Sequence, residues 1–115
     1  MNVVTRFKTP RIRSGQHLAW IRTLPCVVPG CQGKSEPHHL KCGPEGGGTV
    51  TASDVWAVPV CRRHHDAAYP DGLHRYGREM DWWNRLGIDP IAYADRLWAS
   101  SPVNVRLKCS LSCLS

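Results

Sequence analysis

The stretch CRRHHDAAYP, residues 61–70, decides how this 115-residue chain folds. Cys61 and His64 form a C-x-x-H spacing, which is typical of a strand end that leads into a helix and of two ligands to one metal ion. A second pair, Cys26 and Cys31, is separated by a short turn that contains proline and glycine. Three sulfurs and one imidazole suit tetrahedral zinc and close its coordination shell, so we expect a structural zinc site.

The alternative is that these cysteines are ordinary buried residues, because free cysteine is among the most buried residue types. Zinc is favoured, since two paired spacings on short segments rich in proline and glycine rarely arise by accident. Nine prolines and ten glycines divide the chain into short pieces, and a small domain of this kind gains from a metal cross-link. We therefore expect that the chain does not fold without its metal. Three cysteines are left over: Cys42 could substitute for one of these ligands, and the pair Cys109 and Cys113 could hold a second ion.

The charge balance favours a polyanionic partner. The formal net charge is +6 with neutral histidines, and Lys and Arg supply the phosphate contacts that dominate nucleic-acid affinity. Charge alone does not decide, because many small soluble proteins are mildly basic. The candidate phosphate contacts are Arg11, Arg13, Arg62, Arg63 and Arg75.

Nothing in the sequence predicts export or a membrane span. The first fifteen residues lack the apolar core of a secretory signal, and no apolar run is long enough to cross a bilayer. We therefore expect a cytoplasmic protein in a reducing compartment, where clustered cysteines bind metal instead of forming disulfides.

The local patterns predict a small α+β domain. Ser14 can cap a helix that Pro25 ends, and Asp89 with Pro90 is the clearest helix start. A helical pattern from Leu73 closes at a glycine, and its two adjacent tryptophans should face different ways, which leaves Trp82 as the aromatic residue expected to be exposed. We expect extended segments before Cys42 and before Cys61, a helix from about Arg62, a flexible basic arm at 1–13, a folded domain at 14–99 and a tail at 100–115.

Two histidine doublets, His38–His39 and His64–His65, are the most informative feature. Neighbours on a strand point to opposite faces and neighbours on a helix differ by about 100°, so one doublet cannot serve one site. If His64 binds the structural zinc, His65 faces another surface. There it can join one histidine of the other doublet on a second metal ion with open positions, as a hydrolytic site requires.

These residues resemble the HNH, or ββα-metal, endonuclease family in its form with a structural zinc. The likeness rests on Cys-x4-Cys, then EPHHL at residues 36–40, then the segment leading into VPVC at 58–61, then Cys-x-x-His-His. The flanking segments are similar to a phage and prophage branch that includes the Ref-type recombination-linked nucleases. The resemblance spans about residues 14–99 and implies a zinc-stabilised ββα-metal core with flanking helices.

The resemblance also implies roles for individual residues. His39 matches the general base that deprotonates the attacking water, while His38 and His65 match ligands of one catalytic divalent ion, Mg²⁺, Mn²⁺ or Zn²⁺. A neutral imidazole is available as a base near pH 7. The middle position of the family is usually asparagine or histidine, and Asp54 is the nearest candidate here.

The sequence alone does not decide the roles of Asp54 and His74. Asp54 orients the base, joins the metal shell or merely caps a turn after Ser53. His74 supplies a further metal or phosphate contact, or is a solvated surface residue.

The expected function is metal-dependent hydrolysis of DNA phosphodiester bonds with low sequence specificity. One rival is a non-catalytic, zinc-dependent module that binds nucleic acid. Another is a small adaptor for protein partners whose histidine doublets are zinc ligands with spares.

Overall fold

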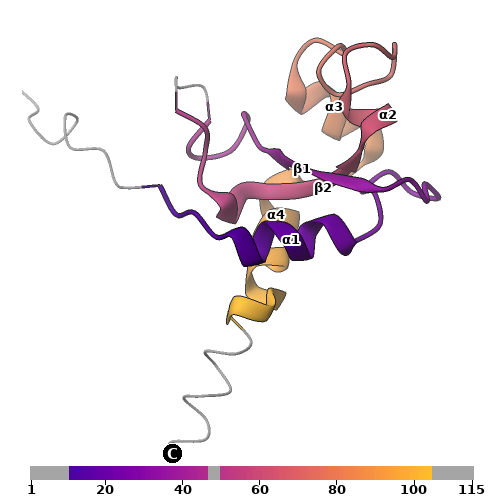
Figure 1. Cartoon of the computed structure of the whole chain (residues 1–115). Helices are drawn as coiled ribbons and strands as arrows, with labels where there is room; N and C mark the ends of the chain where they lie inside the picture. Colours follow the sequence, from indigo (N-terminus) through magenta and orange to yellow (C-terminus); the bar gives the residue numbers. More distant parts are fainter. Residues whose placement is uncertain (1–10, 47–49, 105–115) are drawn as a thin grey trace, which may run out of the picture.

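A computed structural model describes residues 11–46 and 50–104 (Figure 1). The described chain mixes helices with one small antiparallel sheet. In chain order the elements are α1 (Gly15–Thr23), β1 (Ser35–His39), the 3₁₀ turn η2 (Asp54–Trp56), β2 (Ala57–Cys61), α2 (Arg62–His65), α3 (Glu79–Leu86) and α4 (Pro90–Ser100).

The pairing register of the two strands fixes the positions of both histidine doublets. Ser35 lies opposite Cys61 and His39 lies opposite Ala57. All five residues of β2 are buried, and the segment that carries Cys26 covers its outer edge, where the Val27 amide donates to the carbonyl oxygen of Pro59 at 2.9 Å. The sheet therefore brings β1, the first cysteine pair and the end of β2 together.

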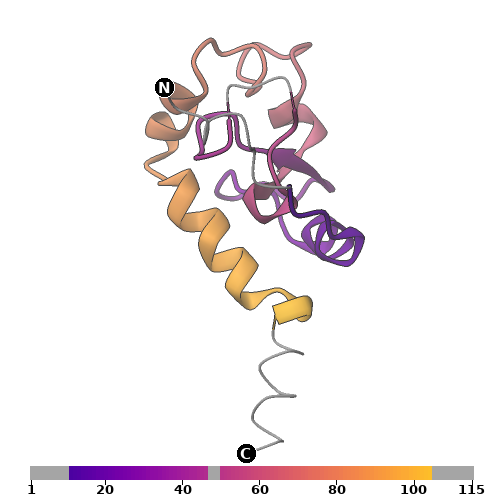
Figure 2. The ribbon, with the colours of Figure 1, turned by 90° about the vertical axis from the view of Figure 1, so that its left-hand side faces the viewer.

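Two capped helices pack beside this sheet. The Ser14 hydroxyl accepts from the His17 amide at the start of α1, and the Asp89 carboxylate accepts from two amides at the start of α4, as the sequence predicts. Helix α1 contacts both strands and α4 contacts β2. The rings of His17 and Trp98 meet edge to face at 4.8 Å, so α1 and α4 contact each other at this point. Figure 2 shows α4 extending along one side of the molecule.

Helix α3 is shorter than the sequence pattern predicts. It begins only at Glu79, because residues 66–78 form successive turns, with Gly77 at φ +111°. These turns cover the side of α3 that was expected to face solvent, and the expectation that Trp82 is exposed is wrong. Trp82 is fully buried and its Nε1 donates to the Asp71 carbonyl oxygen at 2.9 Å. The predicted close of the helix is confirmed, since Gly87 has φ +71°.

Contacts to the domain continue beyond residues 14–99 at both ends. The Ile12 amide donates to the Ser53 hydroxyl, and the Ile12 carbonyl oxygen accepts from the Asp54 amide at 2.8 Å. The Ser101 hydroxyl pairs with His17 Nδ1 at 2.8 Å. Residues 11–13, expected in a flexible arm, and the first residue after α4 are thus fastened to the domain. The rest of the arm and tail, with Cys109 and Cys113, lies outside the described residues.

Within residues 11–46 and 50–104, every helix is too short or too polar to cross a lipid bilayer.

Candidate functional site

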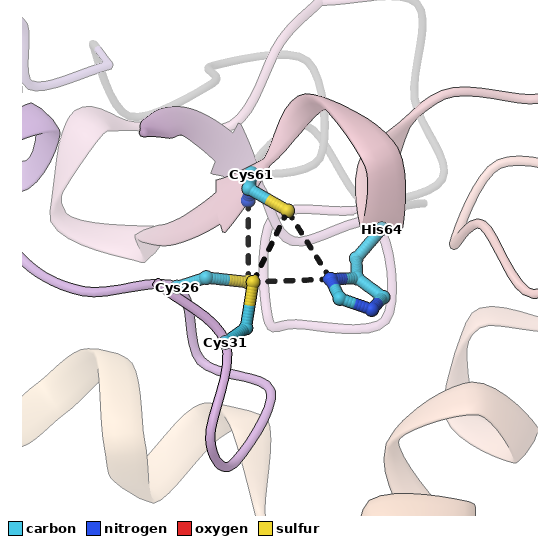
Figure 3. Close-up of side chains that lie close together, drawn as sticks. All are labelled: Cys26, Cys31, Cys61 and His64. Carbon is cyan, nitrogen blue, oxygen red and sulfur yellow. Dashed lines mark hydrogen bonds between the residues drawn. The ribbon is translucent and has the colours of Figure 1, made fainter. Parts of the chain in front are cut away.

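The first candidate site is a cluster of three cysteines and one histidine (Figure 3). Cys61 closes β2 and His64 lies one turn later on α2, while Cys26 and Cys31 approach from the segment after α1. The Cys31 and Cys61 sulfurs are 3.6 Å apart, and His64 Nδ1 lies 3.1 Å from the Cys61 sulfur and 3.7 Å from the Cys26 sulfur. A tetrahedral zinc with Zn–S bonds of about 2.3 Å separates its sulfurs by roughly 3.8 Å. The cluster could therefore hold a metal ion, and its donors and spacings suit zinc.

The backbone around this cluster is shaped to bring the sulfurs together. The Cys61 amide donates to the Cys26 sulfur at 3.3 Å, and the Gly33 amide donates to the Cys31 sulfur at 3.4 Å. A side chain at Gly33 would place its Cβ 2.9 Å from the Cys61 Cβ, so only glycine allows this approach. Burial raises the pKa of the Cys26 thiol to about 11, and a bound dication would oppose this by favouring the thiolate.

The second candidate site consists of His38, His65 and His74. His65 Nε2 lies 3.1 Å from His38 Nδ1 and 3.0 Å from His74 Nε2. His38 comes from β1, His65 from α2 and His74 from the turns that precede α3. The three nitrogen atoms lie close enough together to bind one ion. From the sequence alone, His74 was either a metal or phosphate contact or a solvated surface residue. The structure places it beside His38 and His65, the two ligands that the family resemblance implied.

Two carboxylates on the outer side of the cluster determine where its protons lie. Glu79 Oε2 lies 2.7 Å from His38 Nε2, and Glu36 Oε1 lies 3.0 Å from His65 Nδ1. An ionised carboxylate only accepts hydrogen bonds, so these outer nitrogens carry the ring protons. Burial outweighs the opposing effect of Glu79 and lowers the pKa of His38, which favours the neutral ring.

The inner nitrogens of His38 and His65 therefore present lone pairs to each other. No proton lies between two such acceptors when both rings are neutral, and at about 3 Å they repel each other. A cation placed between them would satisfy both, and ligating histidines commonly donate their outer N–H to a carboxylate in this way. The arrangement is thus suited to a metal ion.

The other member of the first doublet, His39, points to a different partner. Its Nε2 lies 2.8 Å from Asp54 Oδ1, and Asp54 Oδ2 accepts from the Ser14 amide at 2.7 Å. The Arg13 guanidinium lies 3.4 Å from the same carboxylate. Burial alone would raise the pKa of Asp54, but the hydrogen bonds from His39 and Ser14 outweigh it, and the pKa lies below its usual value. Among the described residues, His39 Nδ1 has no hydrogen-bond partner.

One cleft of about 600 Å³ joins these two groups. Its lining includes His39 and all three members of the histidine cluster, together with Lys41. The His39 ring and the histidine cluster therefore border one and the same cleft.

Glu36 and Glu79 were not identified from the sequence. Glu79 lies 41 positions from His38 and carries no spacing signal, because the turns of residues 66–78 decide which side chain reaches β1. Glu36 lies two residues before His38, on the same strand. The two-residue period of a strand is the one signal that could have indicated it.

The five arginines proposed as phosphate contacts differ in their surroundings. Arg13 donates to the Ala52 and Thr51 carbonyl oxygens in addition to its contact with Asp54. Three others lie near carboxylates, at 3.7 Å for Arg11, 3.9 Å for Arg62 and 2.9 Å for Arg63. Arg75 is exposed and has no ion pair within the described part of the chain. Arg13 thus holds the fold around Asp54, and Arg75 is the freest of the five.

Acidification is expected to destabilise the fold in two steps. Burial lowers the pKa of His38, His64 and His74 below the ordinary 6.5. Hydrogen bonds from histidine partners outweigh burial at Asp54 and Glu79 and hold the pKa of each below the ordinary 3.8 and 4.5. The unfolded chain therefore binds more protons, and stability falls first below pH 6.5 and again below pH 4.5. Thermal unfolding of zinc-loaded protein from pH 8 to pH 3 measures both steps, and a flat profile between pH 7 and pH 5 would contradict the first.

Comparison with known proteins places the chain in a family without assigning it an activity. The Uncharacterized protein YdfU of Escherichia coli (strain K12) is 30% identical over 69 residues, which cover 57% of this chain and 20% of that protein. The chain thus matches only about a fifth of that relative's length. No solved structure matches. Residues 1–89 match the family described as Protein of unknown function (DUF968), and the chain belongs to that family.

Proposed function

We propose that this protein is a metal-dependent endonuclease of the HNH type that hydrolyses DNA phosphodiester bonds. The observation that carries the proposal is the shared cleft, onto which both a carboxylate-oriented histidine and a three-histidine metal cluster open. The order of β1, β2 and α2 is also the order that a ββα-metal core requires. We also propose that the protein belongs to the phage and prophage branch of the HNH family that its sequence resembles.

The chemistry follows from the positions of His39 and Asp54. Asp54 accepts a hydrogen bond from the N–H at His39 Nε2 and thereby leaves Nδ1 as the basic nitrogen of a ring that lines the cleft. His39 Nδ1 takes a proton from a water molecule as the water oxygen attacks phosphorus. The bond from phosphorus to the departing deoxyribose oxygen breaks, and that oxygen leaves with the bonding electrons and takes up a proton from solvent water. A divalent ion held by His38, His65 and His74 would supply Lewis-acid stabilisation of the charge on the phosphate.

The three imidazoles also rank the candidate ions. Imidazole suits zinc and other transition metals, whereas Mg²⁺ prefers oxygen ligands and keeps its water. Of Mg²⁺, Mn²⁺ and Zn²⁺, the cluster therefore favours Zn²⁺ and then Mn²⁺. The cluster of three cysteines and His64 is proposed to hold a separate, structural zinc.

The test combines metal analysis with plasmid nicking. Protein purified without chelator should contain one tightly held zinc, and supercoiled plasmid should be nicked when a second divalent ion is added. Mn²⁺, Zn²⁺ and Mg²⁺ are compared over a concentration series. Absence of nicking with every ion, together with retained DNA binding, would refute the nuclease and favour the non-catalytic binding module. Absence of both would favour the adaptor for protein partners.

Neutralising Arg75 is expected to weaken DNA binding by a similar factor for all sequences. A phosphate contact carries no base information, and its loss lowers the salt slope of the binding constant by about one. Fluorescence anisotropy of Arg75→Gln with two unrelated duplexes at several salt concentrations measures both quantities. Arg22→Gln on α1, also exposed, is the matched control and should leave the slope unchanged. An unchanged slope for Arg75→Gln would place the phosphate contacts elsewhere.

A further inference from the structure

The structure assigns Glu79 as a positioning residue for the histidine cluster. It holds His38 in the tautomer and orientation that direct Nδ1 inward, and it anchors the start of α3 to the end of β1. This inference deepens the proposed function and rests on it only where cleavage is concerned.

The Glu79 carboxylate accepts four hydrogen bonds. Oε2 accepts from His38 Nε2 at 2.7 Å and from Trp83 Nε1 at 3.0 Å. Oε1 accepts from the amides of Lys41 and Cys42 at 2.8 and 3.2 Å. Two carboxylate oxygens offer about four lone-pair positions, so the donors occupy the full capacity of the group.

This arrangement leaves His38 with one possible tautomer. The ring is 2% exposed and cannot exchange its carboxylate partner for solvent. With the proton held on Nε2, the lone pair of Nδ1 faces His65. Without the carboxylate, either nitrogen of a neutral ring could carry the proton, and a proton on Nδ1 would block the position that a metal ion needs.

The amide contacts of Oε1 extend this control to the cleft. Lys41 lies two residues after the end of β1 and lines the cleft of the histidine cluster. Because one carboxylate binds this turn, the His38 ring and the indole of Trp83, a shift of α3 would be transmitted to the metal ligand. Glu36 holds His65 by one hydrogen bond and is 44% exposed in its side chain, so it gives a weaker constraint.

The decisive variant is Glu79→Gln, which keeps the size of the side chain. Its amide nitrogen would face N–H donors wherever it is placed, because all four partners of the carboxylate are donors. Loss of a carboxylate that supports a metal-bound histidine typically weakens metal binding by about 10- to 100-fold. Glu79→Asp keeps the charge but shortens the side chain by one methylene, so its loss of metal affinity should be intermediate. Asp81→Asn, on the exposed face of α3, is the matched control.

Two measurements separate this inference from the proposed nuclease activity. The first is the nitrogen NMR spectrum of wild-type protein loaded with one zinc, which should show His38 protonated at Nε2. The second is calorimetric titration of a second equivalent of Zn²⁺, in which Glu79→Gln should bind about 10- to 100-fold more weakly while keeping its first zinc. His38 protonated at Nδ1, or equal second-site affinity for Glu79→Gln and wild type, would overturn the inference. If Glu79→Gln does not fold, the wild-type tautomer and Glu79→Asp decide. Failure of nicking alone would count against the nuclease and leave this result intact.

Discussion

Replacing Cys61 with serine is expected to abolish the folded state. Cys61 ends β2, lies 4% exposed in the core and approaches both Cys31 and His64. Structural zinc contributes about 10–16 kcal/mol in small modules, whereas a whole domain is stable by only about 5–15 kcal/mol. Serine nearly matches the size of cysteine but is a poor zinc ligand. The helical circular dichroism signal and the zinc content of the variant should therefore both be lower than those of wild type. Removing zinc from the wild-type protein with a chelator should have the same effect, and added zinc should reverse it.

Cys42→Ser is the matched control for this prediction. Cys42 is half-buried like Cys31 but belongs to neither metal cluster. The variant should keep one zinc and its cooperative thermal transition. A Cys61→Ser protein that is folded, free of zinc and as stable as wild type would show that the cysteine cluster is ordinary core packing.

Replacing His39 with alanine is expected to reduce plasmid nicking by about 10²- to 10⁴-fold, the usual contribution of a general base. The fold should survive, because His39 is only partly buried and Asp54 keeps its bonds to Ser14 and Arg13. The lost hydrogen bond costs stability of about 1 kcal/mol. Nicking rates at saturating metal measure the effect, with zinc content and DNA affinity as internal controls.

Asp54→Asn tests the other half of the same pair. The amide keeps the shape of the side chain but removes the charge that holds the proton on His39 Nε2, so the nicking rate should fall while metal binding stays unchanged. A loss of second-site metal in this variant would instead place Asp54 in the metal shell. Nicking by His39→Ala at the wild-type rate would exclude His39 as the base.

The divergence of the two doublets was predictable because it depends on backbone geometry alone. On β1, His38 and His39 lie on opposite faces, and on α2, His64 turns to the cysteines while His65 turns to His38. The cysteine spacings likewise need only a turn and a strand end. These features are local, and local geometry is what a single sequence expresses most directly.

Long-range partners were not predictable in the same way. Residues 66–78 form turns where helical spacing was expected, and that path buries Trp82 and brings Glu79 to His38. Arg13 lies in a segment that shows no periodicity, yet its guanidinium donates to the carbonyl oxygens of Thr51 and Ala52. Such contacts depend on how separate segments pack, and the charge or spacing of one segment does not reveal them.

The shared helix α2 fixes the two candidate metal sites relative to each other. His64 and His65 are consecutive residues of a four-residue element that directly follows Cys61. One residue inserted between them would turn the second imidazole by about 100° and move it about 1.5 Å along the axis. We therefore expect the interval from Cys61 to His65 to tolerate neither insertion nor deletion.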